Sequence, residues 1–119
     1  MYTVSDIISD ISRGIMAHNM IENYFSYRIV YFVNSEDKGE KHYIDVLYDG
    51  LRMALENIIR GNLSTTNSIV IAAVTVRKDG ESVSLLSRAY AFSLDGYFKQ
   101  ISGECRDSER NMYGRYAAE

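Results

Sequence analysis

The sequence predicts an α+β fold: an N-terminal helix, a strand, an amphipathic helix and then an antiparallel hairpin or meander of two or three strands, with the helices on one sheet face. Residues 68–94 form two long apolar runs joined through Asp79-Gly80, a strong hairpin signal because both central residues of a type I′ turn need positive φ. Residues 3–17 and 43–60 repeat apolar side chains at helical spacing.

Residues 3–17 predict the first helix. Thr3 followed by Asp6 resembles a capping box, and Asn19 is a suitable C-terminal stop. The apolar stripe is narrow and consists of Val4, Ile7, Ile8, Ile11 and Ile15. Such a stripe packs on one surface, either the sheet or the equivalent helix of a second subunit.

Residues 24–34 predict a strand that is largely apolar on both faces, which is typical of a central strand. One face carries Phe25, Tyr27, Ile29, Tyr31 and Val33, and the other carries Tyr24, Arg28, Val30 and Phe32. The polar stretch 35–41 has no periodicity and predicts a loop, the segment that we expect to be most mobile.

Residues 43–60 favour one long helix with an apolar stripe of Ile44, Leu47, Tyr48, Leu51, Leu55 and Ile58. The alternative is that the Asp-Gly pair at 49–50 ends a short strand over residues 42–48, which would leave a helix of two to three turns. Residues 61–62, Gly-Asn, are expected to end the helix in either case.

The two-residue hairpin turn fixes a register for residues 68–94. It places Val76 opposite Val83, Val74 opposite Leu85 and Val70 opposite Ala89, all on one face, with Ile69 opposite Tyr90 and Ile71 opposite Arg88 on the other. A three-residue loop with Gly80 in the left-handed region would slip the register by one and place Ser82 and Ser84 among the valines. We favour the two-residue turn.

A second Asp-Gly pair at 95–96 predicts a third antiparallel strand over residues 97–105. Residues 106–119 are polar and predict a tail that is partly disordered or forms a short helix. Residues 1–105 are therefore expected to form a single domain.

The composition narrows the functional classes. The net charge is -3 with dispersed Lys and Arg, which disfavours nucleic-acid binding. The single cysteine, Cys105, and the lack of a long apolar run predict a soluble cytoplasmic protein without a membrane segment. Ten tyrosines without any proline or tryptophan are a composition that we associate with small phage or mobile-element proteins, for which the cytoplasm is that of the host.

Residues that could support catalysis are few. Cys105 has His18 and His42 as candidate bases, but no motif surrounds it and the spacing of the three is not that of a zinc site. Asp45 and Asp49 are a carboxylate pair on a helix face that we expect to be solvated. The glycines form no phosphate-binding loop. The sequence predicts no catalytic residue, cofactor or metal.

Residues 88–92, RAYAF, resemble a degenerate form of the aromatic strand motif of RNA-recognition modules, and residues 30–34, VYFVN, resemble its companion. Ala89 replaces the glycine, Ser93 the valine and Asp95 the final aromatic residue of that motif. The resemblance implies RNA binding by aromatic side chains on the sheet.

The leading functional prediction is a small non-catalytic protein-binding module of the inhibitor, immunity or adaptor type, which acts by occluding a partner protein. The second sheet face is expected to need cover, which predicts a homodimer. Because Tyr and Arg are favoured in interfaces, the expected partner-binding residues are Tyr27, Tyr31, Arg88, Tyr90 and Phe92. The alternatives are an RNA-binding module and a small enzyme that uses His42 and a carboxylate beside the 35–41 loop.

Overall fold

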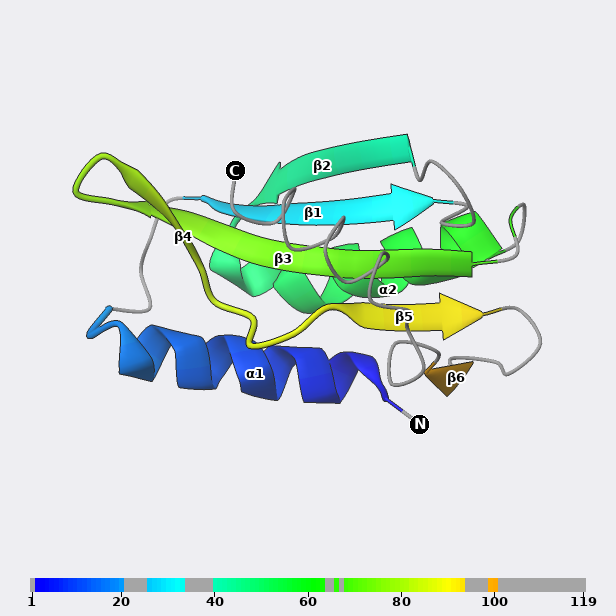
Figure 1. The fold of residues 1–119 in the computed structure, drawn as a ribbon, viewed down its shortest axis with the longest axis horizontal. Coiled ribbons are helices and arrows are strands. Elements are labelled where there is room, and N and C mark those ends of the chain that lie inside the picture. The colour runs from blue at the N-terminus through cyan, green and yellow to red at the C-terminus, as the bar shows by residue number, and fades with distance from the viewer. Residues whose placement is uncertain are drawn as a thin grey trace.

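The computed structural model describes residues 2–20, 26–33, 40–63, 66, 68–93 and 99–100. Its elements, shown in Figure 1, are α1 (Val4–Ala17), β1 (Tyr27–Val33), β2 (Glu40–Val46), the 3-10 turn η1 (Tyr48–Gly50), α2 (Leu51–Leu63), β3 (Ser68–Lys78), β4 (Glu81–Ser84), β5 (Tyr90–Ser93) and β6 (Lys99–Gln100). The strands form an antiparallel sheet in the order β2-β1-β3-β5-β6, with β4 also paired to β3. The predicted α+β class is confirmed.

Both ends of α1 follow from its sequence. The backbone N–H of Asp6 donates to the Thr3 hydroxyl over 3.3 Å, and the Thr3 N–H donates to the Asp6 carboxylate over 2.7 Å, which completes the predicted capping box. Asn19 has a positive φ of 54°, and the Met20 N–H then donates to the Ile15 carbonyl over 2.9 Å. This is the Schellman geometry that ends a helix at a left-handed residue.

The prediction of one helix over 43–60 is wrong, and the alternative with a short strand is the correct one. Residues 40–46 form β2, which pairs with β1, and α2 begins only at Leu51. Ile44 and Leu47 match the helical spacing of Leu51, but they are 42% and 65% exposed. β2 is an edge strand, so its few apolar side chains need not alternate, and pairing with β1 decides its conformation. The helix also continues past residues 61–62 to Leu63, whose side chain is buried.

The two-residue hairpin turn is confirmed. Asp79 and Gly80 have φ of 53° and 82°, and Val76 pairs with Val83 as predicted. Beyond Ser84 the chain leaves the ladder over residues 85–89 and returns as β5.

The far end of the predicted hairpin register is wrong by two positions. Val70 pairs with Ala91 where Ala89 was expected, and Ile71 pairs with Tyr90 where Arg88 was expected. The interruption over residues 85–89 supplies the extra positions. Val83 packs against the cluster beneath the helices, whereas Ala91, eight residues later, lies in the cluster on the opposite face, so β5 does not keep the faces that a continuous strand would give it.

A β-bulge in β3 changes which side chains face the helices. Ala72 is skipped in the pairing of β3 with β1, so the alternation reverses at this point. Ile71 and Val74 both belong to the core beneath the helices, whereas Val70 lies on the opposite face. The prediction that Val70 and Val74 share a face is therefore wrong, because a strict period of two cannot accommodate an inserted residue.

The buried side chains form two clusters, one on each sheet face. The cluster that includes α1 and α2 also contains Ile69, Ile71, Tyr90 and Phe92. The predicted register had placed Ile69, Ile71 and Tyr90 on the face away from Val74 and Val76, which belong to this same cluster. The cluster on the second face consists of Val30, Phe32, Val70, Ala72, Ala73 and Ala91, each at most 5% exposed within the single chain.

Three predictions fall wholly or mostly outside the described residues. In the expected loop 35–41, only Glu40 and Lys41 are described, and they begin β2. In the expected strand 97–105, only Lys99–Gln100 are described, as β6. The tail 106–119 lies outside the described residues.

Candidate functional site

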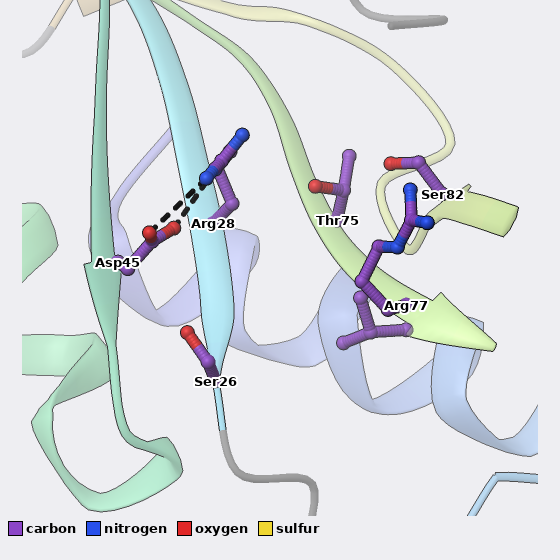
Figure 2. A pocket seen from close by; sticks show the side chains of 7 residues that line it. Ser26, Arg28, Asp45, Thr75, Arg77 and Ser82 are labelled. Atoms are coloured by element: carbon purple, nitrogen blue, oxygen red, sulfur yellow. Dashed lines mark hydrogen bonds and ion pairs between the residues drawn. The ribbon is translucent and has the colours of Figure 1, made fainter. Parts of the chain in front are cut away.

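A polar pocket of about 300 Å³ lies on the second sheet face, close to the hairpin turn (Figure 2). Its lining residues come from β1, β2, β3, β4 and the residue before β1: Ser26, Arg28, Asp45, Thr75, Val76, Arg77 and Ser82. The apolar cluster of the same face lies farther along β1 and β3. The second face is thus apolar at one end and polar at the other.

Strand pairing brings the polar residues of this pocket together. Arg28 of β1 lies between Asp45 of β2 and Thr75 of β3 in the ladder. Arg77 of β3 is paired with Ser82 of β4 across the turn. Since alternate residues of a strand share a face, Thr75 and Arg77 project to the same side. The pocket therefore requires all four strands and no helix.

The Arg28 guanidinium is held in a bidentate ion pair. Its Nε donates to Asp45 Oδ1 over 2.9 Å and its Nη2 donates to Asp45 Oδ2 over 3.2 Å. The guanidinium also lies over the Tyr43 ring, 4.3 Å from the ring centroid, a favourable cation–π position. The hydrogen bond from Arg28 lowers the pKa of Asp45, and the same bond raises the pKa of Arg28. Both groups remain charged at neutral pH.

Arg77 is oriented by the turn that it borders. Its Nη2 donates to the Gly80 carbonyl oxygen over 2.7 Å, and the side chain remains exposed. The described lining residues thus provide two guanidinium groups, one carboxylate and the hydroxyls of Ser26, Thr75 and Ser82. Hydrogen-bond donors outnumber fixed acceptors, so the pocket is suited to an anionic oxygen.

The ion pair in the pocket predicts a measurable titration. Replacing Arg28 by Gln should raise the pKa of Asp45 toward its ordinary value of 3.8, because the hydrogen bond that lowers it is lost. A lowered carboxylate pKa stabilises the fold above the unfolded pKa, and this contribution is lost as the pH falls through the folded pKa. The check is an NMR titration of the Asp45 carboxyl carbon, with Arg52→Gln as the control. An unchanged Asp45 midpoint in the Arg28 variant would contradict the assigned cause.

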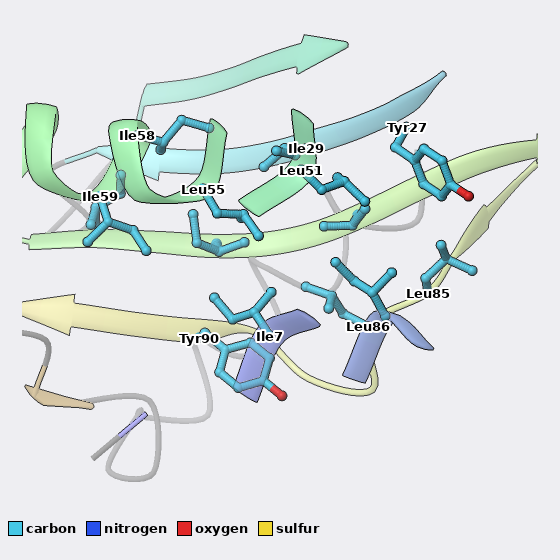
Figure 3. Packing of buried hydrophobic residues seen from close by; sticks show 14 of the residues in the cluster. Ile7, Tyr27, Ile29, Leu51, Leu55, Ile58, Ile59, Leu85, Leu86 and Tyr90 are labelled. Carbon is cyan, nitrogen blue, oxygen red and sulfur yellow. The ribbon is translucent and has the colours of Figure 1, made fainter. Parts of the chain in front are cut away.

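The five residues predicted to bind a partner do not form a common surface. Tyr27, Tyr90 and Phe92 are 0%, 3% and 0% exposed, respectively, and belong to the core beneath the helices, where Figure 3 shows Tyr27 and Tyr90. Tyr31 is half-buried and its ring stacks on His42 with a centroid distance of 5.3 Å. Only Arg88 is exposed, and it donates to the Tyr2 hydroxyl.

These positions bear on both alternative functions. Buried Tyr90 and Phe92 cannot stack on bases, which removes the observation that favoured an RNA-binding sheet. His42 Nε2 lies 3.7 Å from the Glu40 carboxylate and against Tyr31, but it lines neither of the two pockets described in this section. No substrate-sized space adjoins it among these pockets.

A second cavity of about 310 Å³ lies between α1 and the start of α2, lined by Ile8, Ile11, Tyr48, Asp49, Leu51 and Arg52. Arg52 Nη1 donates to the Ser5 hydroxyl over 3.2 Å, which links the two helices beside this cavity. Asp49 and Arg52 are exposed, and the apolar lining continues the core of the helical side. We interpret this cavity as a gap between packed helices.

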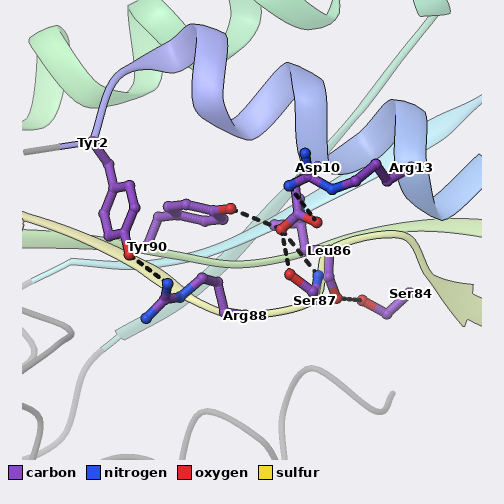
Figure 4. Close-up of polar contacts among 8 residues, drawn as sticks. All are labelled: Tyr2, Asp10, Arg13, Ser84, Leu86, Ser87, Arg88 and Tyr90. Carbon is purple, nitrogen blue, oxygen red and sulfur yellow. Dashed lines mark hydrogen bonds and ion pairs between the residues drawn. The ribbon is translucent and has the colours of Figure 1, made fainter.

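A buried carboxylate joins α1 to the interruption between β4 and β5 (Figure 4). Asp10 is 2% exposed, and its Oδ2 accepts from the Ser87 N–H at 3.0 Å, the Ser87 hydroxyl at 2.9 Å and the Tyr90 hydroxyl at 2.7 Å. Its Oδ1 lies 3.6 Å from Arg13 Nη2. Burial, and then the hydrogen bond to Asp10, raises the pKa of Tyr90. This junction positions α1 against residues 85–89.

Sequence reasoning missed the pocket but contained part of its signal. The two-residue turn at Asp79-Gly80 implies that Arg77 lies opposite Ser82, the pairing that the structure has. Arg28 is the charged residue in the otherwise largely aromatic and β-branched stretch 24–34, and this pattern also indicates a functional position. The missing information was that residues 40–46 form a strand, because without β2 there is no Asp45 beside Arg28.

The comparisons with protein-family models, curated proteins and solved structures give no match to this chain. Among the described residues, no group of three or more His, Cys, Asp or Glu side chains could hold a metal ion. None of the described helices has the length and apolar character required to cross a membrane.

Proposed function

We propose that this protein is a non-catalytic binding module that holds an acidic side chain of a partner protein in the polar pocket. The observation that carries the proposal is the pair of guanidinium groups, Arg28 and Arg77, set around one cavity with three hydroxyls. A planar guanidinium matches the two oxygens of a carboxylate. Binding in this way covers part of the partner, as an inhibitor, immunity or adaptor protein does, and the single cysteine suits the cytoplasmic setting that we propose for it.

The chemistry of the pocket favours binding over catalysis. The described lining residues contain no histidine or cysteine, and their one carboxylate, Asp45, is engaged by Arg28. A general base would need a free acceptor with a pKa near the working pH, whereas the pKa of Asp45 is lowered. Arg28 over Tyr43 is instead a combination that is enriched at the centres of protein interfaces.

The net charge favours a protein segment over nucleic acid as the partner. The chain carries a charge of -3, so a polyanion would be repelled at long range, whereas a short acidic segment needs only the local positive potential of the pocket. Arg28 and Arg77 are both exposed and accessible to such a segment.

The proposal is tested by selection from a library of random peptides displayed on phage. We expect the natural sequence to select peptides enriched in Asp and Glu, and the double variant Arg28→Gln, Arg77→Gln to bind them at least about tenfold more weakly, because charge-assisted hydrogen bonds are lost. The matched control is Arg60→Gln, which removes an exposed arginine on α2. It should bind the peptides like the natural sequence.

Two results would overturn the proposal. One is a selected set without acidic enrichment, and the other is equal binding of that set by the double variant. An NMR titration with acetate and with inorganic phosphate separates the two anion chemistries. Shifts at Arg28 and Arg77 that appear with phosphate alone would contradict a carboxylate ligand.

A further inference from the structure

Strand β2 forms one edge of the described sheet, with β1 on one side and no described strand on the other (Figure 1). Edge strands offer unpaired backbone groups to any other strand, and proteins usually protect them. The edge carries the charged residues Glu40, Lys41 and Asp45, but it also exposes apolar side chains: Tyr43 is 59% exposed, Ile44 42% and the following Leu47 65%. This edge is suited to receive another strand.

We propose that a second copy of this chain pairs with β2 in an antiparallel arrangement, about a two-fold axis that passes through Tyr43. In a symmetric antiparallel pair, opposed residues must project from the same sheet face. One residue therefore lies opposite its own copy, and the axis runs between these two copies. An axis at Tyr43 pairs the whole strand Glu40–Val46 with its copy. The sheet then continues from one copy into the other.

The charges along β2 select this register. With the axis at Tyr43, Lys41 lies opposite Asp45 of the second copy, and the same pair recurs on the other side of the axis. The two Tyr43 rings meet at the centre, and no like charges are opposed. Cross-strand pairs of opposite charge and of aromatic residues stabilise a sheet.

Neighbouring registers lose these contacts. An axis at His42 sets Lys41 opposite Tyr43, and an axis at Ile44 sets Tyr43 opposite Asp45, so neither forms a charge pair. A sequence with Lys and Asp at equal distances from a central Tyr is complementary to itself when reversed. This self-complementarity indicates a second copy as the occupant of the edge.

The dimer would also change the polar pocket. Asp45 lies in the pocket, paired with Arg28, so Lys41 of the second copy would add a cation at its rim. The two pockets would lie on the same face of one continuous sheet, on either side of the axis. The inference rests on the β2 edge and its charges, and it does not depend on the ligand proposed for the pocket.

Cysteine cross-linking tests the register directly. In a chain with Cys105→Ser, we expect Tyr43→Cys to form a disulfide-linked dimer at least tenfold faster than His42→Cys or Ile44→Cys. Directly opposed Cβ atoms are about 4.5–5.5 Å apart, close to what a disulfide needs. Residue 42 lies opposite residue 44 of the copy, so two cysteines at position 42, or two at position 44, are diagonal neighbours about 7–8 Å apart. Equal rates at the three positions, or a faster rate at position 42 or 44, would overturn the inference.

Sedimentation of the unmodified chain provides a second test that requires no cysteine. We expect the mass to rise with concentration from 13.6 kDa to twice that value. Lys41→Asp should raise the dimer Kd at least tenfold at low salt, since it opposes two pairs of carboxylates. Arg60→Asp makes the same charge change on α2 and should leave the Kd unaltered. A monomer at all concentrations, or a Kd unaffected by Lys41→Asp, would contradict the proposal.

Discussion

Replacing Asp10 by Ala is expected to lower the free energy of unfolding by about 3 kcal/mol, because the buried Tyr90 hydroxyl and the part-buried donors of Ser87 lose their acceptor. The loss also frees α1 from residues 85–89. Urea denaturation measures the effect as a lower midpoint at an unchanged slope. Because Asp10 is 2% and Tyr90 3% exposed, water cannot reach the Tyr90 hydroxyl in place of the carboxylate without opening this part of the junction.

Two further variants separate the charge of Asp10 from its shape. Asp10→Asn keeps one acceptor oxygen and should fall between Ala and the natural sequence. Ser12→Ala, an exposed position on the same helix, should change the free energy of unfolding by less than about 0.5 kcal/mol. If the Asp10→Ala and Ser12→Ala variants unfold at the same urea concentration, the hydrogen bonds that Asp10 accepts make no net contribution to the free energy of unfolding.

Replacing Gly14 by Ala is expected to lower the free energy of unfolding by about 2–3 kcal/mol. A Cβ at this position would lie 2.2 Å from the Leu85 carbonyl oxygen and 2.8 Å from the Leu85 carbonyl carbon. Both are backbone atoms, so α1 or residues 85–89 would have to move. The clash exceeds the gain of about 1 kcal/mol that Ala otherwise brings to a helix.

Gly61 is the matched control for this substitution, because it is also helical and a Cβ there would meet nothing within 4 Å. Gly61→Ala should therefore raise the free energy of unfolding by about 0.5–1 kcal/mol. Thermal unfolding of the two variants should show Tm shifts of opposite sign. Shifts of the same sign would mean that the close approach of Gly14 to Leu85 does not control packing.

The local features of the fold could be predicted because short sequence signals determine them. The capping box at Thr3, the left-handed Asn19 and the Asp79-Gly80 turn depend on neighbouring residues alone. The central position of β1 was likewise indicated by its two apolar faces.

Features that depend on distant partners could not be predicted in the same way. The strand at 40–46 has apolar residues at helical spacing, and only pairing with β1 makes it a strand. The bulge at Ala72 leaves no local signal, because alanine fits either face, yet it reverses the orientation of half of β3. The polar pocket depends on both features, since it needs Asp45 on β2 and Thr75 beyond the bulge.

The attachment of α1 by Asp10 has a consequence for synthesis on the ribosome. The hydrogen-bond partners of Asp10 lie 77 and 80 residues later in the chain. The helix therefore emerges long before the segment against which it packs, and Ile7, Ile11 and Ile15 have no complete core until β5 has been made. The nascent chain therefore exposes this apolar stripe until β5 has been made, and α1 completes its packing only after the strands have formed.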